Sequence, residues 1–177
     1  MIGALCAAAA VLLLWSGLAK LARPAATARM LAVVLGRRAP GGHPTARSIG
    51  LVEVAVGAAV LVTGGRVACA ALAVSYAVFT AVAVRLAGGS RPAPCGCFGR
   101  ADAPTGPIHV AVDAVACAVG VAATVAPPGP WGGFGGQPAL VAVVGLGQVV
   151  LLAAMAYVLV AVLPSVLSDR DRVVGRT

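Results

Sequence analysis

Residues 139–163 read ALVAVVGLGQVVLLAAMAYVLVAVL and carry no charged side chain. A helix rises about 1.5 Å per residue, so roughly 25 apolar residues are enough to cross a hydrocarbon core that is about 30 Å thick. This stretch decides the fold class, because a run of that length and composition is typical of a transmembrane helix. We therefore expect an all-α membrane protein and look for further spans.

Four more stretches of similar length are almost free of charge. The whole chain is 60% hydrophobic and only 10% charged, whereas soluble domains are about a quarter charged, so a water-soluble globule is excluded. The first stretch lacks a basic segment before it and is followed by Leu18-Ala19-Lys20-Leu21, a poor cleavage site, so we expect it to be retained rather than removed as a signal peptide. We predict one integral-membrane domain, residues 1–177, that crosses the bilayer five times. The expected spans are residues 2–19, 48–65, 67–84, 108–126 and 139–163.

The connections between these spans differ in length and composition. Residues 27–35 predict a short helix at the membrane surface, and residues 37–44 follow as a loop rich in Gly and Pro. Gly64-Gly65-Arg66 predicts a tight turn between the second and third spans. Residues 127–138 carry no charge and are rich in Gly and Pro, with two aromatic side chains that suit a membrane interface: Trp131 and Phe134.

The basic side chains fix the expected orientation. Five spans place loops 20–47 and 85–107 and the C-terminal tail on one side of the membrane, and this side receives every one of the 13 basic residues except Arg66. Such an asymmetry marks the cytoplasmic face, so we expect the N-terminus outside and the C-terminus in the cytoplasm of a cell-membrane protein. The net charge of +8 is thus explained by membrane loops and not by nucleic-acid binding, which would need a basic stripe on a soluble fold.

Ionisable side chains inside spans are costly and usually face the interior of the bundle. Glu53 lies about five residues into the second span and Asp113 about five into the fourth, both counted from the same predicted side. Lys20 and Arg85 close the first and third spans on that side. His109 adds a further polar group, because His109, Asp113 and Cys117 have the spacing i, i+4, i+8 of one helical stripe. We predict that these groups converge in one leaflet.

A plainer interpretation accounts for the same residues. Glu53 would form a buried ion pair with Lys20 or Arg85 that orders the bundle, and Asp113 would do the same. His109 would be an interfacial residue, because it lies one residue into its span. Both interpretations predict a buried Glu53, and they differ only in what the cluster does.

Three of the five cysteines look like apolar packing residues. Cys6, Cys69 and Cys117 are flanked by Ala and Val inside predicted spans, where a thiol packs as a small apolar group. Cys6 and Cys69 both fall near the outer face, however, which leaves a second thiol pair open.

The other two cysteines form the sequence Cys95-Gly96-Cys97, in a loop where apolar packing is no explanation. A disulfide across one residue closes a small strained ring, and strained bridges exchange readily with other thiols. The competing interpretation is half of a metal site completed by His109, Cys117 or Asp113, but the spacing matches no established zinc pattern. A structural or inert role is the third interpretation, and we favour redox exchange.

Several of these elements together carry a resemblance. Ser16-Gly17-Leu18-Ala19-Lys20-Leu21, Glu53 with Gly57, and Cys95-Gly96-Cys97-Phe98-Gly99 resemble the MauE family of methylamine-utilisation membrane proteins, related to DoxX. The resemblance implies a DoxX-like bundle of five transmembrane helices, with a four-helix core plus one. It also implies a role in maturing methylamine dehydrogenase, whose small subunit is disulfide-rich, beside a thioredoxin-like partner. The chain departs from the pattern at Ile49-Gly50, where a proline is expected before the Glu.

These observations predict a membrane thiol–disulfide redox protein or accessory factor. Cys95 and Cys97 would exchange disulfides, while Glu53, His109 and Asp113 would form a polar support that handles protons. The expected partners are the lipid bilayer, a thioredoxin-like protein and an amine dehydrogenase subunit, with no nucleic acid and no resident metal. The alternatives are a non-catalytic membrane scaffold for an assembly pathway and a DoxX-like subunit that passes electrons to quinone.

Overall fold

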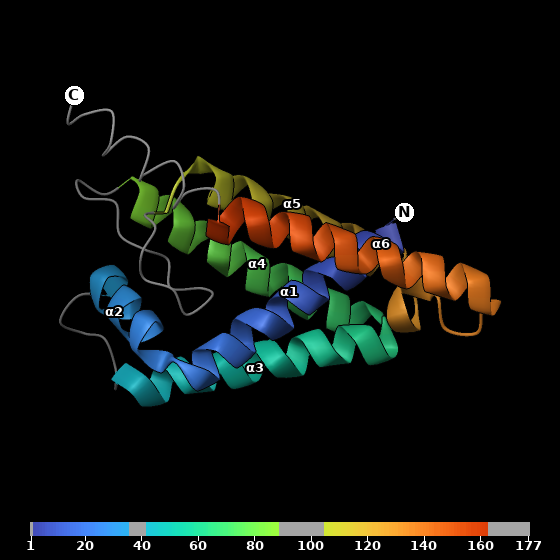
Figure 1. The fold of residues 1–177 in the computed structure, drawn as a ribbon. Helices are drawn as coiled ribbons and strands as arrows, with labels where there is room; N and C mark the ends of the chain where they lie inside the picture. The colour runs from blue at the N-terminus through green and yellow to red at the C-terminus, as the bar shows by residue number, and fades with distance from the viewer. Residues whose placement is uncertain (1, 36–41, 89–104, 163–177) are drawn as a thin grey trace, which may run out of the picture.

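The computed structural model describes residues 2–35, 42–88 and 105–162 (Figure 1). Regular structure within these ranges is helical throughout. Five helices are long and apolar enough to cross a membrane, which confirms the five-span prediction. They are α1 (Ile2–Ala22), α3 (Gly42–Thr63), α4 (Arg66–Ala87), α5 (Pro107–Val125) and α6 (Ala139–Tyr157), the last continued by the π-helical turn η3 (Val158–Val162).

Helix α3 begins earlier than the sequence pattern predicts. Residues 42–44 were expected to end a loop, but they form the first turn of α3. Pro44 is tolerated there because the first N–H groups of a helix have no partner within the helix. As a result Glu53 lies near the middle of α3 and not about five residues from its start. The other loop residues at this point, 36–41, are outside the described part of the chain.

A shorter helix, α2 (Pro24–Leu35), follows α1 directly and confirms the predicted short helix, although it begins three residues earlier. Its buried face includes Met30, which packs against Leu86 near the end of α4. α2 also packs along α3, at the end of the bundle away from the N-terminus (Figure 1). It therefore lies at the end where α1 and α4 finish and α5 begins.

The four helices α1, α3, α4 and α5 pack as two close pairs, α1 with α3 and α4 with α5. A core of buried side chains joins the pairs, and its larger members are Leu13, Leu72 and Tyr76. The Tyr76 hydroxyl donates a hydrogen bond of 2.8 Å to the backbone carbonyl of Ala9, which links α4 to α1. α6 packs on the outside of α1, where Val149 and Ala153 meet small alanines. α1 is thus the most buried of the five spanning helices.

The opposite end of the bundle is closed by the connection between α5 and α6. Its 3₁₀ helix η2 (Pro130–Gly133) contacts both α1 and α3. Gly64 has a φ of +53°, and a Cβ at this position would overlap the Gly129 carbonyl, so glycine is required in the turn between α3 and α4. Trp131 is exposed, as an interfacial residue would be, whereas Phe134 packs against Gly145 of α6.

Candidate functional site

A buried ion pair joins α1 to α3. The Lys20 Nζ lies 2.8 Å from Oε2 of Glu53, and the two side chains are only 2% and 4% exposed. The same Nζ donates a hydrogen bond of 2.6 Å to the Ser16 hydroxyl, one helical turn earlier. Water does not reach these two charged groups. They are therefore stabilised by each other and by the Ser16 hydroxyl.

Two glycines make this pairing feasible. A Cβ added to Gly17 would lie 2.6 Å from the Gly50 carbonyl oxygen, and one added to Gly50 would lie 2.8 Å from the Gly17 carbonyl oxygen. The backbones of α1 and α3 therefore touch at this crossing. A Cβ added to Gly17 would also lie 3.0 Å from the Glu53 Cβ, and one added to Gly50 would lie 3.1 Å from the Lys20 Cβ. Each glycine thus leaves room for the charged residue of the other helix.

The second helix pair completes the surroundings of Lys20. Its Nζ lies 5.2 Å from the centre of the Phe79 ring on α4, within the range of a cation–π interaction. Phe79 is in turn held edge-on by Tyr76, with ring centres 5.7 Å apart. Asp113, half-buried in the second turn of α5, is close enough for its charge to act on Lys20. We call Ser16, Lys20, Glu53 and Asp113 the Lys20 centre.

The charges of the Lys20 centre do not balance when all its groups are ionised. One ammonium group faces two carboxyl groups in an environment that screens charge poorly. Within the described residues the second carboxyl oxygen of Glu53, Oε1, is buried and accepts no hydrogen bond. The centre therefore has the composition of a site that takes up and releases a proton, and it has one acceptor atom available for a donor.

The other predicted site residues are distributed differently. Arg85 is exposed, so of the two candidate partners for Glu53 only Lys20 pairs with it. His109 is buried, and its Nδ1 accepts a hydrogen bond of 3.3 Å from the backbone N–H of Gly106, which makes it part of the N-terminal cap of α5. Its observed contact is structural. Cys95 and Cys97 lie outside the described residues, in the segment between α4 and α5.

Sequence reasoning missed Ser16 and Phe79. A signal existed for Ser16, because it precedes Lys20 by four residues and shares its helical face. No signal existed for Phe79, since its position over Lys20 depends on how α4 is rotated against α1.

Of the remaining cysteines, Cys6 and Cys69 lie toward the opposite end, whereas Cys117 is in the middle of α5. The Cys6 Sγ on α1 and the Cys69 Sγ on α4 are 4.0 Å apart, and both residues are fully buried. Cys117 is half-buried and packs against the same core. Cys6 precedes Lys20 by 14 residues, or roughly 21 Å of helix at 1.5 Å per residue, so the thiols and the Lys20 centre occupy different depths.

Comparison with known protein families identifies the chain. Residues 1–126 match the model of the family described as methylamine utilisation protein MauE. The chain belongs to the MauE family. It is therefore a multi-pass membrane protein of methylamine utilisation. Comparison with curated proteins and with solved structures gave no match.

The region that matches the MauE family ends just after α5. It covers α1 to α5 and thus contains the Lys20 centre and all five cysteines. The connection with η2 and the outer helix α6 follow the matched region. The candidate site residues of this MauE protein therefore all lie in the part of the chain that matches the family.

Proposed function

We propose that this MauE protein is a membrane thiol–disulfide redox protein, or an accessory factor to one, that supports disulfide formation in a partner such as methylamine dehydrogenase. Cys95 and Cys97 are the exchanging pair. The observation that carries the proposal is the Lys20 centre, which lies toward the end of the bundle where the segment containing both cysteines leaves α4 and enters α5. Disulfide exchange consumes and releases protons, and this centre holds more carboxyl groups than cations.

The exchange is balanced in atoms and electrons. A thiolate of the partner attacks one sulfur of the Cys95–Cys97 bridge, so that the bridge opens and a mixed disulfide forms. The second partner thiol displaces the protein sulfur from that mixed disulfide. The partner loses two electrons and two protons and gains a disulfide, while Cys95 and Cys97 become thiols. A thioredoxin-like protein carries out the same exchange with this pair in either direction.

The test is a trapping experiment with single cysteine variants. In Cys97→Ser the attacking Cys95 lacks the thiol that resolves the intermediate, so a mixed disulfide with a thioredoxin-like protein should accumulate and should disappear on reduction. Cys95→Ser is compared with it, because the roles of the two sulfurs can be reversed. Cys117→Ser is the matched control and should trap nothing. Full maturation activity in the Cys95→Ser/Cys97→Ser double variant would overturn the redox function.

A second candidate function is a non-catalytic scaffold that holds a partner in the membrane. It is favoured by the geometry of the Lys20–Glu53 pair, which orders α1 against α3 whether or not it moves a proton. The double cysteine variant distinguishes the two functions, since a scaffold tolerates the loss of both sulfurs. Either function is compatible with the proposed orientation in the cell membrane, with the N-terminus outside and the C-terminus in the cytoplasm.

A further inference from the structure

One polar side chain of the outer helix α6 is exposed at mid-membrane depth. Gln148 lies nine residues after the start and twelve before the end of the apolar span Ala139–Val160, which is roughly 14 and 18 Å along the helix. Its side chain is exposed and makes no hydrogen bond within the described residues. Lipid tails surround a helix surface at that depth, and they offer an amide neither a donor nor an acceptor.

Other uncharged polar side chains in the spans find partners within the protein. The hydroxyl groups of Ser75, Thr80 and Thr124 donate hydrogen bonds of 2.9, 2.8 and 2.6 Å to backbone carbonyls of their own helices. The Tyr76 hydroxyl donates to a carbonyl of α1. Gln148 has no such bond, so its amide NH₂ and carbonyl need a partner from outside the described residues.

Gln148 lies on a stripe of α6 that has the spacing of a helix–helix contact. Four exposed residues follow one another at intervals of four, three and four, the repeat that keeps side chains on the seam between two helices: Val144, Gln148, Leu151 and Met155. The three apolar members are each more than half exposed. We call these four residues the Gln148 stripe.

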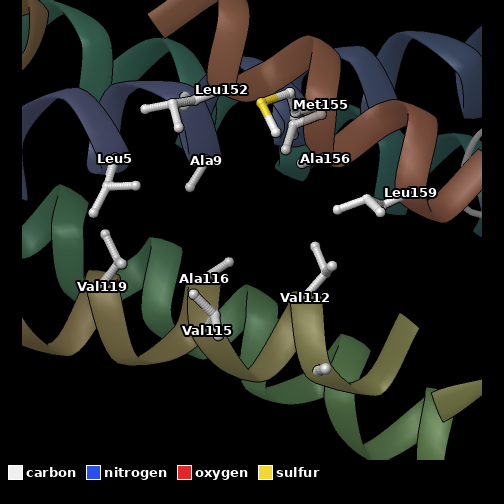
Figure 2. Close-up of a pocket in the computed structure, with 13 residues that line it drawn as sticks. Leu5, Ala9, Val112, Val115, Ala116, Val119, Leu152, Met155, Ala156 and Leu159 are labelled. Atoms are coloured by element: carbon white, nitrogen blue, oxygen red, sulfur yellow. The ribbon is translucent and has the colours of Figure 1, made fainter. Parts of the chain in front are cut away.

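The Gln148 stripe faces an open side of α6. An apolar cavity of about 340 Å³ separates α6 from α5, and Figure 2 shows Met155 of α6 across it from Val112 and Val115 of α5. Gln148 and Leu151 border a second hollow, of about 250 Å³, between α6 and α1. Within the described residues the main neighbour of α6 is α1, so the stripe is left for a helix of another chain.

We propose that the Gln148 stripe is the contact surface between two copies of this chain. In a two-fold dimer with its axis along the membrane normal, both copies have the same orientation and a residue near the axis meets its own counterpart. An amide is self-complementary, because the NH₂ of one Gln148 donates to the carbonyl of the other and accepts the reverse bond. The apolar members of the stripe pack on either side of this pair.

The other outer face of α6 does not have this property. Val143 and Val150 are 66% and 67% exposed, but lipid tails satisfy valine side chains, so exposure alone does not call for a protein partner. The inference does not rest on the proposed redox function, since it uses no cysteine. It concerns a helix that follows the region matching the MauE family.

The experiment measures the oligomeric state of the full chain in lipid. The protein is labelled at its C-terminus and reconstituted in liposomes over a range of protein-to-lipid ratios, and subunits are counted by single-molecule photobleaching. We expect monomers at low density and dimers at high density. Gln148→Leu keeps the size of the side chain but removes the amide, and should raise the dissociation constant about fivefold or more. Val150→Leu is the matched control and should leave it unchanged.

Two results would overturn the proposal: a wild-type protein that stays monomeric at every ratio, or a dissociation constant that does not rise in Gln148→Leu. Cysteine crosslinking then identifies the contacting face without relying on the Gln148 variant. In a chain whose five cysteines are replaced by Ala, Leu151→Cys should form disulfide-linked dimers on mild oxidation in the membrane. Val150→Cys, on the other outer face, should not. Crosslinking as efficient at residue 150 as at residue 151 would also exclude this surface.

Discussion

Replacing Glu53 by Gln tests the energetic role of the Lys20 centre. The substitution preserves shape but removes the negative charge that lies 2.8 Å from the Lys20 Nζ. Breaking one partner of a buried ion pair costs about 3–5 kcal/mol, because the remaining charge is left without compensation. We expect the lower end, about 3 kcal/mol, since the Gln carbonyl still accepts a hydrogen bond and Asp113 still acts on Lys20. At about 1.4 kcal/mol per tenfold, the ratio of folded to unfolded protein should fall roughly a hundredfold.

The assay is reversible unfolding in mixed micelles by titration with a denaturing detergent, followed by tryptophan fluorescence. Arg66→Gln is the control, because Arg66 is exposed at the start of α4 and its loss should change the free energy of unfolding by no more than about 0.5 kcal/mol. Replacing both partners, as Lys20→Met with Glu53→Leu, should recover stability relative to Glu53→Gln, since a buried apolar pair needs no compensation. A Glu53→Gln protein as stable as Arg66→Gln would refute the buried ion pair. If the Lys20→Met/Glu53→Leu variant regains stability but not maturation activity, the Lys20 centre has a role beyond packing.

Two further predictions concern topology and helix packing. A reporter fused after Thr177 should behave as cytoplasmic and one inserted in residues 127–138 as external, and export of the C-terminal reporter would contradict the N-out orientation. Gly50→Val should destabilise the protein by more than about 2 kcal/mol in the same unfolding assay, because the new Cβ would lie 2.8 Å from the Gly17 carbonyl oxygen. Gly147→Val is the matched control, since nothing lies within 4 Å of that position, and equal effects of the two would disprove the close contact of α1 and α3.

The five spans could be predicted from the sequence because each depends on local composition alone. The burial of Glu53 could be predicted for the same kind of reason, since a carboxylate in a span must avoid lipid. The partner of Glu53 could not be predicted, because Lys20 and Arg85 both lie in the last turn of their helices. The choice between them is made by the Gly17–Gly50 crossing, which brings α1 against α3 while Arg85 faces outward.

The hydrogen bond of His109 and the contact between the Cys6 and Cys69 thiols could not be predicted from the sequence pattern either. His109 lies on the same helical stripe as Asp113. Its ring, however, accepts a hydrogen bond from the backbone N–H of Gly106, which caps the start of α5. Cys6 and Cys69 were expected to lie at similar depth, which the structure confirms. A similar depth does not determine which helices are neighbours, however. Only the packing of α4 across α1 brings the two sulfurs together.

The ion pair between the first and second long helices also bears on how the chain enters the bilayer. A single charged side chain in an inserting helix costs about 2.5–3.5 kcal/mol near the helix centre, and less near the helix end, where Lys20 lies. Lys20 and Glu53 are only 33 residues apart, so α1 and α3 can leave the translocon together as a hairpin in which the two charges already neutralise each other. Asp113 lies 60 residues beyond Glu53 in the sequence, so it is synthesised after both members of the pair. A nascent chain in which α3 is absent would leave Lys20 in α1 without the carboxylate that pairs with it.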